Sequence, residues 1–412
     1  MPENIRKPAI RFAGFTEEWE ERKLSDLVMI ERGGSPRPID DYITEAADGL
    51  NWVKIGDAPT QGRYITKTAE KIKPEGLSKT RQVQPGDLIL SNSMSFGKPY
   101  IMSINGCIHD GWLLIRNIKG HFDLKFLCQM LGTDQMLDQY RMFAAGSTVN
   151  NLNKELVGNT AISLPTIREQ NVIGEYLETI DRFITLHQRK YAKLSNIKKA
   201  MLEKMFPKNG TSVPEIRFVG FTDAWEQRKA ADLAEYSKGN GYSKCDLTEA
   251  GTPIILYGRL YTKYQFLIDD IDTFAVAKSS SVFSKGGEVI IPASGETAED
   301  IARAAVVAKS GVLLGGDLNI LCLIEQINPV FFAIAISNGK PQEELAKKAQ
   351  GKSVVHIHNS DIQEVMIPLP KRAEQDKIVG LFSHLDHLIT LHQRKLERLQ
   401  NIKKACLEKM FV

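Results

Sequence analysis

The sequence has few cysteines and no long uncharged apolar run. Its five cysteines are scattered over 412 residues and never stand in CxxC spacing, which favours buried or free thiols in a reducing compartment over disulfides or zinc. The first residues lack the apolar segment of a signal peptide. No stretch approaches the roughly eighteen uncharged apolar residues of a membrane-spanning helix. We therefore expect a cytoplasmic protein without a membrane segment.

Catalytic motifs are missing as well. There is no Pro-Pro dipeptide, and so no Asn/Asp-Pro-Pro-aromatic signature of amino-methyltransferases, and there is no GxGxxG, HExxH or GxSxG. Gly351-Lys352-Ser353 resembles the end of a Walker A loop, but residue 346 is alanine and a strand-like segment follows instead of a helix. His356 and His358 alternate in that segment, where a polar surface strand is favoured over a metal site. We expect a protein that is not an enzyme, with no cofactor and no metal on this chain.

The bulk composition is ordinary. With 42% hydrophobic and 25% charged residues, the chain has enough apolar side chains for real cores. Its length favours more than one domain. The net charge of +3 neither requires nor excludes a nucleic-acid partner.

The chain contains a long internal repeat. Residues 11–27 read RFAGFTEEWEERKLSDL, and residues 217–233 read RFVGFTDAWEQRKAADL; we call these the opening segments. Residues 181–206, DRFITLHQRKYAKLSNIKKAMLEKMF, return at 386–411 as DHLITLHQRKLERLQNIKKACLEKMF. The interiors between these ends hardly match in sequence. A duplicated frame around unlike interiors predicts a pseudo-two-fold molecule that recognises two different things.

Each repeat is expected to hold one mixed α/β domain of ordinary size. Strand-like runs bounded by Gly, Pro, Asn and Ser lie at 86–90, 112–115, 287–291 and 319–323, and helical patterns at 124–131 and 330–337. The expected fold class is α+β, with two mixed α/β globular domains separated by two long antiparallel coiled-coil helices in a pseudo-two-fold internal repeat. The boundaries place a first domain at 1–165, a central helix and linker at 166–213, a second domain at 214–370 and a C-terminal helix at 371–412.

A long helix closes each repeat. Proline is absent between Pro165 and Pro207 and after Pro370, and helix formers dominate both stretches. A helix with a narrow apolar stripe is not stable alone, so we expect the two closing helices to pack against each other. Their apolar positions recur in steps of four and three, as in a coiled-coil seam: Ile173, Leu177, Ile180, Ile184, Tyr191 and Leu194 in the first, and Ile378, Phe382, Leu385, Ile389, Leu396 and Leu399 in the second.

One seam position is polar in both helices, at His187 and His392. These residues are either ordinary hydrogen-bonded or half-exposed histidines, or they specify register or contact a partner. No second ligand lies at helical spacing on either helix, which argues against a metal site.

Polar, glycine-rich loops are the candidate binding residues. Arg, Asn, Ser and Lys are the donors that read base edges and hold phosphates. Any single loop is readily explained as a solvated turn, but loops at matching places in both repeats favour binding for the set. The candidates are Arg32, Ser35, Arg37, Ser91, Asn92, Ser93, Lys98, Ser147, Asn150 and Asn151 in the first interior, and Lys238, Asn240, Tyr242, Tyr257, Arg259, Ser294, Lys352 and Ser353 in the second.

The closing helices carry more positive charge than the rest of the chain. Residues 181–206 have a net charge of +5 and residues 386–411 of +3, against +3 for the whole chain. Such helices could follow a phosphate backbone. They are equally typical of a solvated coiled-coil face or of a surface that docks acidic helices.

These features together resemble the specificity subunit of type I restriction-modification enzymes. Each repeat has a run from the end of a recognition domain into the closing helix, at 146–181 and 351–386. The segments PGDLILS at 85–91 and GGDLNI at 315–320 also look like family segments. The skeleton LP…EQ…I…D is carried by Leu164, Pro165, Glu169, Gln170, Ile173 and Asp181, and again by Leu369, Pro370, Glu374, Gln375, Ile378 and Asp386.

The resemblance implies a division of labour. Each interior would be a target recognition domain that reads one half of a bipartite, asymmetric site in double-stranded DNA, and the closing helices would set the gap between the halves. The helices would also dock two DNA adenine methyltransferase subunits and, in the full complex, restriction/translocase subunits. S-adenosylmethionine, ATP and Mg would then belong to those partner subunits. The docking residues would be His187, Gln188, Arg189, His392, Gln393 and Arg394.

Two other interpretations stay open at this point. The chain could serve a complex that contains only methyltransferase subunits. Alternatively, from a different class, it could be a duplicated coiled-coil scaffold that binds only protein.

Overall fold

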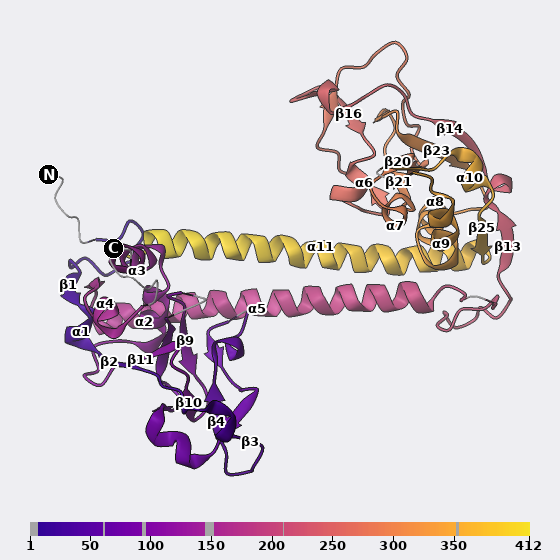
Figure 1. The fold of residues 1–412 in the computed structure, drawn as a ribbon. Coiled ribbons are helices and arrows are strands. Elements are labelled where there is room, and N and C mark those ends of the chain that lie inside the picture. The colour runs from indigo at the N-terminus through magenta and orange to yellow at the C-terminus, as the bar shows by residue number, and fades with distance from the viewer. Residues whose placement is uncertain (1–6, 61, 93–95, 145–151, 209, 352–353) are drawn as a thin grey trace. The chain divides into compact units, whose positions relative to one another are not determined.

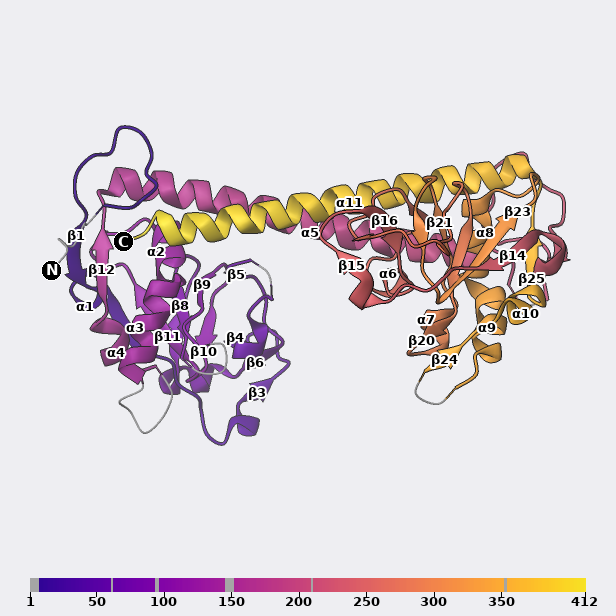
Figure 2. The same cartoon turned by 90° about the horizontal axis from the view of Figure 1, so that it is seen from above.

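The computed structural model describes residues 7–60, 62–92, 96–144, 152–208, 210–351 and 354–412. They form two compact units: unit 1 is Met1–Tyr191 with Leu391–Val412, and unit 2 is Ala192–Thr390. Helices α5 (Ile167–Lys204) and α11 (Arg372–Lys409) are the closing helices, each 38 residues long and continuous in both views (Figure 1, Figure 2). Each unit therefore holds one α/β domain, the start of its own closing helix and the end of the other.

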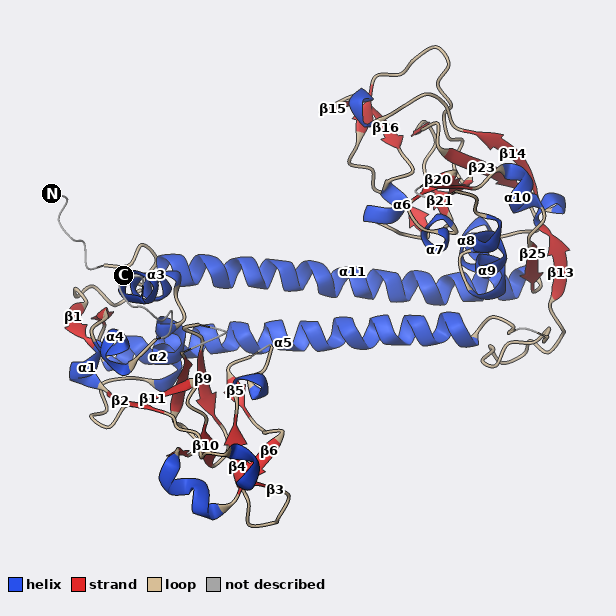
Figure 3. Cartoon of the chain, in the orientation of Figure 1, coloured by secondary structure: helices blue, strands red, loops and turns tan. Residues whose placement is uncertain are grey.

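Unit 1 is built on two five-stranded sheets, in the orders β2-β11-β8-β9-β5 and β3-β6-β4-β10-β7, with β1 paired antiparallel to β12. Its α-helices, α1 to α4, lie near the start of α5 (Figure 3). The elements are β1 (Glu20–Lys23), α1 (Leu24–Leu27), β2 (Met29–Arg32), β3 (Ile43–Thr44), β4 (Leu50–Val53), β5 (Tyr64–Ile65), β6 (Glu70–Ile72), β7 (Arg81–Val83), β8 (Leu88–Ser91), β9 (Pro99–Met102), β10 (Gly106–Ile108), β11 (Trp112–Arg116), α2 (Leu124–Leu131), α3 (Asp134–Ala144), α4 (Lys154–Gly158) and β12 (Ala161–Leu164).

Unit 2 repeats this plan. Its main sheet has the order β14-β23-β19-β21-β17, a four-stranded sheet has the order β15-β18-β16-β22, β13 pairs with β25, and β20 pairs with β24. The elements are β13 (Glu226–Lys229), β14 (Ala234–Lys238), β15 (Leu247–Thr248), β16 (Thr252–Ile255), α6 (Arg259–Thr262), β17 (Leu267–Ile268), β18 (Phe274–Ala275), β19 (Val289–Pro292), β20 (Ser294–Gly295), α7 (Ala298–Ile301), β21 (Ala305–Val307), β22 (Leu313–Leu314), β23 (Leu318–Leu323), α8 (Pro329–Ile336), α9 (Gly339–Lys348), β24 (Val355–His356), α10 (Asn359–Gln363) and β25 (Met366–Leu369).

The two interiors share a topology although their sequences do not match. Numbered by their order along the chain, the strands of both main sheets lie in the spatial order first, fifth, third, fourth, second. In this order β2, β11, β8, β9 and β5 correspond to β14, β23, β19, β21 and β17. The strands and helices expected from the sequence are confirmed as β8, β11, β19, β23, α2 and α8. The expected fold class is confirmed too, with two α/β domains and two long helices packed together.

The main sheet of unit 1 is buried on both faces. Successive side chains of a strand point to opposite sides, and each side packs into a different core. Leu88 and Leu90 belong to the core that contains the helices, whereas Ile89 belongs to the core between the two sheets. Unit 2 shows the same alternation, with Ile291 toward the helices and Ile290 on the other side.

The predicted seam of the closing helices is buried where each helix leaves its domain. Ile173, Leu177 and Ile180 lie in the core of unit 1, and the matching residues of α11 lie in the core of unit 2. Among the described residues, no helix is long and apolar enough to cross a membrane.

The far end of each closing helix contributes an aromatic side chain to the core of the unit that it reaches. In unit 1, Phe411 packs against Trp19 and Phe126, with ring centroids 6.4 Å and 5.4 Å away. Unit 2 has the same trio in Phe206, Trp225 and Phe331, with centroid distances of 5.7 to 5.8 Å. This explains why the tryptophan of the opening segment and the phenylalanine that ends the helix occur in both repeats.

A buried arginine–glutamate pair joins each opening segment to its closing helix. Arg11 donates from Nε and Nη2 to Glu169 at 2.7 and 2.8 Å, and Arg217 donates to Glu374 at 2.6 and 2.8 Å. Both glutamates are 1% exposed. The bidentate geometry is the strongest form of this pair.

The glutamine that follows each glutamate bonds the closing helix to the interior of its own unit. Gln170 accepts from Asp123 N–H at 3.0 Å, at the start of α2, and donates to Pro165 O at 3.0 Å. Gln375 does the same with Asn328 N–H and Pro370 O, at 2.8 and 2.9 Å. The repeated Glu-Gln dipeptide is therefore explained by packing within each unit.

Replacing Glu169 with glutamine should destabilise unit 1, because it leaves the largely buried Arg11 guanidinium without its counter-charge. We expect a loss of about 3 kcal/mol of unfolding free energy, and the same for Glu374→Gln in unit 2. Denaturant unfolding measures both. Glu20→Gln is the matched control: its pair with Arg22 is solvent-exposed, so the change should stay within about 0.5 kcal/mol. Equal effects of all three variants would contradict this role of the buried pairs.

Candidate nucleic-acid interface and partner surface

The glycine-rich loop after β2 is anchored to the turn between β10 and β11. Gly33 N–H donates to Trp112 O at 2.9 Å, and Gly34 N–H donates to Ile108 O at 3.2 Å. A Cβ on Gly33 would stand 2.2 Å from His109 O, so this approach requires glycine. The glycines predicted from sequence to form a binding loop therefore hold that loop against a turn.

The loop after β14 is anchored in the same way in unit 2. Gly239 N–H donates to Leu318 O at 3.0 Å, and Asn240 N–H donates to Leu314 O at 3.1 Å. A Cβ on Gly239 would meet Gly315 O at 1.9 Å. The acceptors are again the last residue of one strand and the first residue of the next, so the duplicated frame extends to the candidate loops.

In unit 1 the anchoring turn brings three candidate residues, from two loops, together on Asp110. Ser35 Oγ donates to Asp110 Oδ1 at 3.0 Å, and Asn92 Nδ2 donates to the Asp110 carbonyl at 2.8 Å. Arg32 Nε lies 3.4 Å from the same carbonyl. His109 Nε2 lies 3.0 Å from Asp110 Oδ1. The predicted residues Arg32, Ser35 and Asn92 thus share one centre.

Arg37 reaches the same centre from the end of the loop. Its Nη2 lies 3.8 Å from Asp110 Oδ2, and its side chain is 83% exposed. Beside it is a hollow of about 1080 Å³, lined also by Trp52, Lys54 and His109. A hollow with both apolar and charged lining beside an exposed guanidinium suits a flat ligand with hydrogen-bonding edges.

The structure places the remaining candidates of unit 1 differently. Ser91 and Asn92 are buried, and Ser91 Oγ accepts from Lys98 N–H at 2.9 Å, so Ser91 supports the end of β8. Lys98 itself is exposed. Four predicted residues of this unit lie outside the described residues: Ser93, Ser147, Asn150 and Asn151.

In unit 2 the anchored loop packs against residues 276–281. Asn240 Nδ2 donates to Ser280 O at 2.6 Å. Tyr242 Oη lies 2.5 Å from Ser281 Oγ, and Lys278 Nζ lies 4.6 Å from the Tyr242 ring centroid. Lys238 is exposed at the end of β14. The counterpart of the Asp110 centre is thus built from different side chains.

A second group in unit 2 connects Tyr257 and Ser294. Tyr261 packs edge-on against Tyr257, with ring centroids 6.0 Å apart, and its hydroxyl donates to Ser294 O at 2.7 Å. Ser294 Oγ lies 3.1 Å from His356 Nδ1. His356 is exposed on the short strand β24, as expected for a polar surface strand.

Arg259 is turned into the protein. It is 8% exposed, and its guanidinium lies 3.1 Å from an Asp272 carboxylate oxygen and 2.6 Å from Asp270 O. DNA contact by Arg259 stays a prediction, as it does for Lys352 and Ser353, which lie outside the described residues.

Several residues of these sites were missed by sequence reasoning, chiefly His109, Asp110, Tyr261, Lys278 and Ser281. For the first two a signal was present, since a polar triplet ending in glycine separates two strand-like runs. Tyr261 and Lys278 carry no comparable local signal, because their roles come from tertiary packing.

His187 and His392 meet in the helix seam of unit 1, with Nδ1 atoms 2.8 Å apart. One ring must donate to the other, so the neutral pair holds a hydrogen bond. Burial lowers the pKa of His187, as do His392, Lys395 and Lys190. The pKa of His392 is lowered by burial and by the same two lysines. Both rings therefore resist protonation.

Acidification should weaken this seam. Because the folded pKa values lie below the ordinary value near 6.5, the unfolded chain binds more protons below that pH, and stability falls as the pH drops through the folded values. We expect the unfolding temperature to fall between pH 7.5 and 5.5 by more in the native protein than in a variant with both His187→Gln and His392→Gln. Parallel pH profiles for the two proteins would contradict this.

The other predicted docking residues flank the histidine pair. Arg189, Gln393 and Arg394 are exposed, and Gln393 Nε2 lies 3.3 Å from Glu397. In the described part of the chain, Gln188 Oε1 is buried without a hydrogen-bond partner. Four polar side chains therefore surround the seam.

Two exposed leucines share this region of unit 1. Leu186 is 43% exposed and its repeat counterpart Leu391 is 37% exposed. An apolar residue that is repeated and yet exposed is not explained by packing within the unit.

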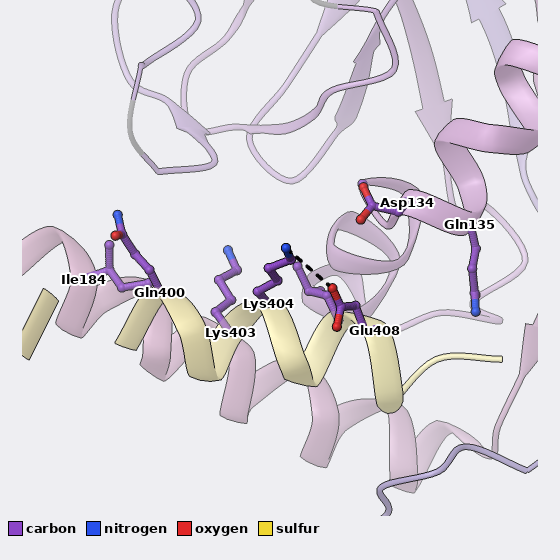
Figure 4. Close-up of a pocket in the computed structure, with 9 residues that line it drawn as sticks. Asp134, Gln135, Ile184, Gln400, Lys403, Lys404 and Glu408 are labelled. Atoms are coloured by element: carbon purple, nitrogen blue, oxygen red, sulfur yellow. Dashed lines mark ion pairs between the residues drawn. The ribbon is translucent and has the colours of Figure 1, made fainter. Parts of the chain in front are cut away.

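A smaller hollow of unit 1, about 490 Å³, lies where the end of α11 approaches the start of α3 (Figure 4). It is lined by Asp134, Gln135, Ile184, Gln400 and Lys404 among others. Lys404 Nζ lies 3.9 Å from Glu408 Oε1. Charged and amide side chains therefore line the surface of unit 1 beside the end of α11.

Lys403 anchors the end of α11 to unit 1 by an ion pair with Asp181. Gln129 Nε2 donates to the other Asp181 oxygen at 2.7 Å. Unit 2 has the equivalent pair between Lys198 and Asp386. The aspartate of the repeated skeleton thus joins the two closing helices within each unit. In the described chain no group of three or more His, Cys, Asp or Glu side chains is arranged to hold a metal ion.

Fold and surface together define a duplicated protein, with two α/β domains of one topology and unlike loops, attached to paired helices. The family described as "Type I restriction modification DNA specificity domain" matches the chain twice, at residues 16–196 and 222–401. The chain belongs to this family, and it is a specificity subunit of the type I restriction-modification class, which is a non-catalytic subunit.

Relatives and solved structures agree with this assignment. The chain is 23% identical to the putative type I restriction enzyme MjaX specificity subunit of Methanocaldococcus jannaschii, over 98% of this chain and 94% of the relative. It is 20% identical to the MjaVIII specificity subunit of the same organism, and this alignment spans 63% of each chain. The crystal structure of the S subunit from M. genitalium matches 98% of this chain and 99% of its own, with 14% identity and a TM-score of 0.65, which shows a shared fold.

Proposed function

We propose that the chain reads a bipartite, asymmetric site in double-stranded DNA, with each α/β domain reading one half. The observation that carries this is the shared loop anchor on unlike turns. The same two backbone hydrogen bonds hold the loop in both domains, but the turn is His109-Asp110-Gly111 in one and 315–317, Gly-Gly-Asp, in the other. A constant scaffold with different side chains is what reading two different sequences requires.

We further propose that the closing helices set the length of the unread gap. Each has 38 residues, or about 57 Å at 1.5 Å per residue, against roughly 34 Å for a turn of B-DNA. An uninterrupted helix is stiff, so its length bounds the spacing of the domains attached to it.

The repeated exposed residues on these helices support docking of two copies of one partner. Buried repeated residues such as Trp19 and Glu169 are explained by packing, but Leu186, Arg189 and their counterparts Leu391 and Arg394 are exposed. We assign this surface to two adenine methyltransferase subunits, with restriction/translocase subunits joining in the full complex. S-adenosylmethionine, ATP and Mg belong to those partners, and the complex acts in the cytoplasm.

Footprinting tests the proposal. The chain, reconstituted with its methyltransferase subunits, should protect two short segments of DNA about one helical turn apart, separated by a segment that tolerates any sequence. Protection that does not depend on sequence would contradict the proposal and favour a scaffold that binds only protein. Removal of the restriction subunit should leave the footprint unchanged, since a complex of methyltransferase and specificity subunits suffices for recognition.

A further inference from the structure

Asp110 is the centre of a cluster of side-chain contacts that is found in unit 1 and not in the matching turn of unit 2. Its carboxylate accepts from Ser35 Oγ and lies 3.0 Å from His109 Nε2, and its carbonyl accepts from Asn92 Nδ2. Asp110 therefore links the loop after β2, the end of β8 and the β10–β11 turn. The loop position itself is set by backbone bonds from Gly33 and is shared with unit 2. The backbone bonds that place the loop are thus shared by both units, and in unit 1 Asp110 also fixes the side chains of Ser35 and Asn92.

In unit 2 the position that matches Asp110 is Gly316, and the carboxylate of this turn, Asp317, stands one residue later. The turn begins with Gly315 and Gly316, and the loop residue Asn240 of unit 2 bonds to Ser280 O instead. The Asp110 centre is therefore specific to the first domain. A feature present in one domain only belongs to what that domain recognises.

Arg37 is the part of this centre that is free to reach a ligand. Its side chain is 83% exposed, with the guanidinium 3.8 Å from the second Asp110 oxygen, which is too long for a hydrogen bond. Asp110 orients the arginine electrostatically and leaves its donors available. The adjoining hollow, lined by Arg37, Lys54, His109 and Asp110 among others, has a volume of about 1080 Å³.

The chemistry of this pair selects one kind of base pair. An arginine fork donates to O6 and N7 of guanine, and an aspartate accepts from N4 of cytosine. In a G·C pair these groups lie side by side in the major groove. A guanidinium next to a carboxylate presents the complementary pattern. An A·T pair places the N6 donor of adenine between the acceptors N7 of adenine and O4 of thymine, so it offers no two adjacent acceptors to the arginine fork.

Building on the proposed function, we infer that Arg37 reads a G·C pair in the half-site recognised by the first domain and that Asp110 is the positioning residue for Arg37. Arg37 makes the contact with guanine. Asp110 places a negative charge 3.8 Å from the guanidinium, which draws Arg37 toward the hollow without occupying its donors.

Binding of the full chain with its methyltransferase subunits to its mapped target tests this inference. Duplexes that differ at one base pair of the first half would be compared by competition. The native protein should prefer one G·C pair by about tenfold or more over the other base pairs. Arg37→Lys should lose this preference at that pair alone, because lysine lacks the fork, and Asp110→Asn should reduce it at the same pair.

Two variants serve as controls. Arg22→Lys changes another exposed arginine of unit 1, and Asp317→Asn changes the matching turn of unit 2; neither should alter preference in the first half. Because Arg37 is exposed, its substitution keeps the test valid even if Asp110→Asn lowers stability, which thermal unfolding would show. Full discrimination by both Arg37→Lys and Asp110→Asn, or a first half without a G·C pair, would overturn the inference. A native complex with no sequence preference would instead overturn the proposed function.

Discussion

Exchanging the first interior for that of another family member will change one half of the DNA target and leave the other half intact. The expected change is large, since each mismatched base pair costs about 1–3 kcal/mol, so three altered pairs weaken binding to the old target by roughly a hundredfold or more. The reason is that the loops proposed to read DNA lie in the interiors, which differ between the repeats, whereas the frame is the same in both. Methylation mapping of the chimera shows both halves in one measurement.

The structure indicates where the exchange should begin and end. Arg11 and Trp19 lie before the interior and contact Glu169 of α5 and Phe411 at the end of the chain, so all four should come from this chain. The donor interior, replacing residues 24–160, must supply an aromatic residue in place of Phe126, which packs against Phe411. The reciprocal exchange within unit 2 is the control and should change the other half only. A chimera in which both halves change would refute independent reading by the two domains.

Inserting one turn of helix into both closing helices will lengthen the unread gap by one to two base pairs without altering either half. Four residues add about 6 Å of helix, and successive base pairs are roughly 3.4 Å apart. The insertions belong between the units, after Tyr191 and after Thr390, where each helix passes from one unit to the other. There they leave the anchoring pairs of Lys403 and Lys198 in place.

An insertion into α5 alone is the control for this experiment. It puts one helix out of step with the other, so the seam is mismatched and stability should fall. The paired insertion should restore stability and shift the gap. A paired insertion that folds and binds with the original gap would show that the helices do not set the spacing.

Much of the frame could be predicted from the sequence, because its signals are local. The proline-free stretches and the three-four spacing of apolar residues predict both closing helices, which are confirmed. Ile173 and Ile378 of the predicted seam are buried in the cores of their units, whereas Tyr191 of the same seam is 37% exposed. The repeat singled out Glu169 and Gln170 as part of a shared skeleton, but it did not show which residues they contact. Their partners Arg11 and Asp123 lie far away in sequence and meet them only after folding.

The shared topology of the interiors could not be read from the sequence. Strand order in a sheet depends on long-range pairing, and the two interiors reach one order with different side chains. The candidate loops were found by residue type, which does not tell an exposed arginine from an inward one. Both Arg37 and Arg259 stand in polar loops, yet the side chain of Arg37 is 83% exposed, whereas that of Arg259 is buried and donates to the Asp272 carboxylate.

The structure divides the repeated residues into buried ones and exposed ones, a distinction that the sequence does not show. Trp225 and Glu374 recur because each unit needs them for packing. Leu391 and Arg394 recur although they are exposed, which points to a partner seen twice. The histidine pair shares features of both groups. It joins the two closing helices within unit 1, and exposed polar side chains flank it.

Mapping methylated adenines in cells that carry this subunit with its methyltransferase tests the central claim most directly. The account predicts one asymmetric motif with two specified halves and an unspecified gap of fixed length, which disappears when the subunit is removed. A continuous motif, a palindromic motif, or methylation that does not depend on this subunit would contradict it.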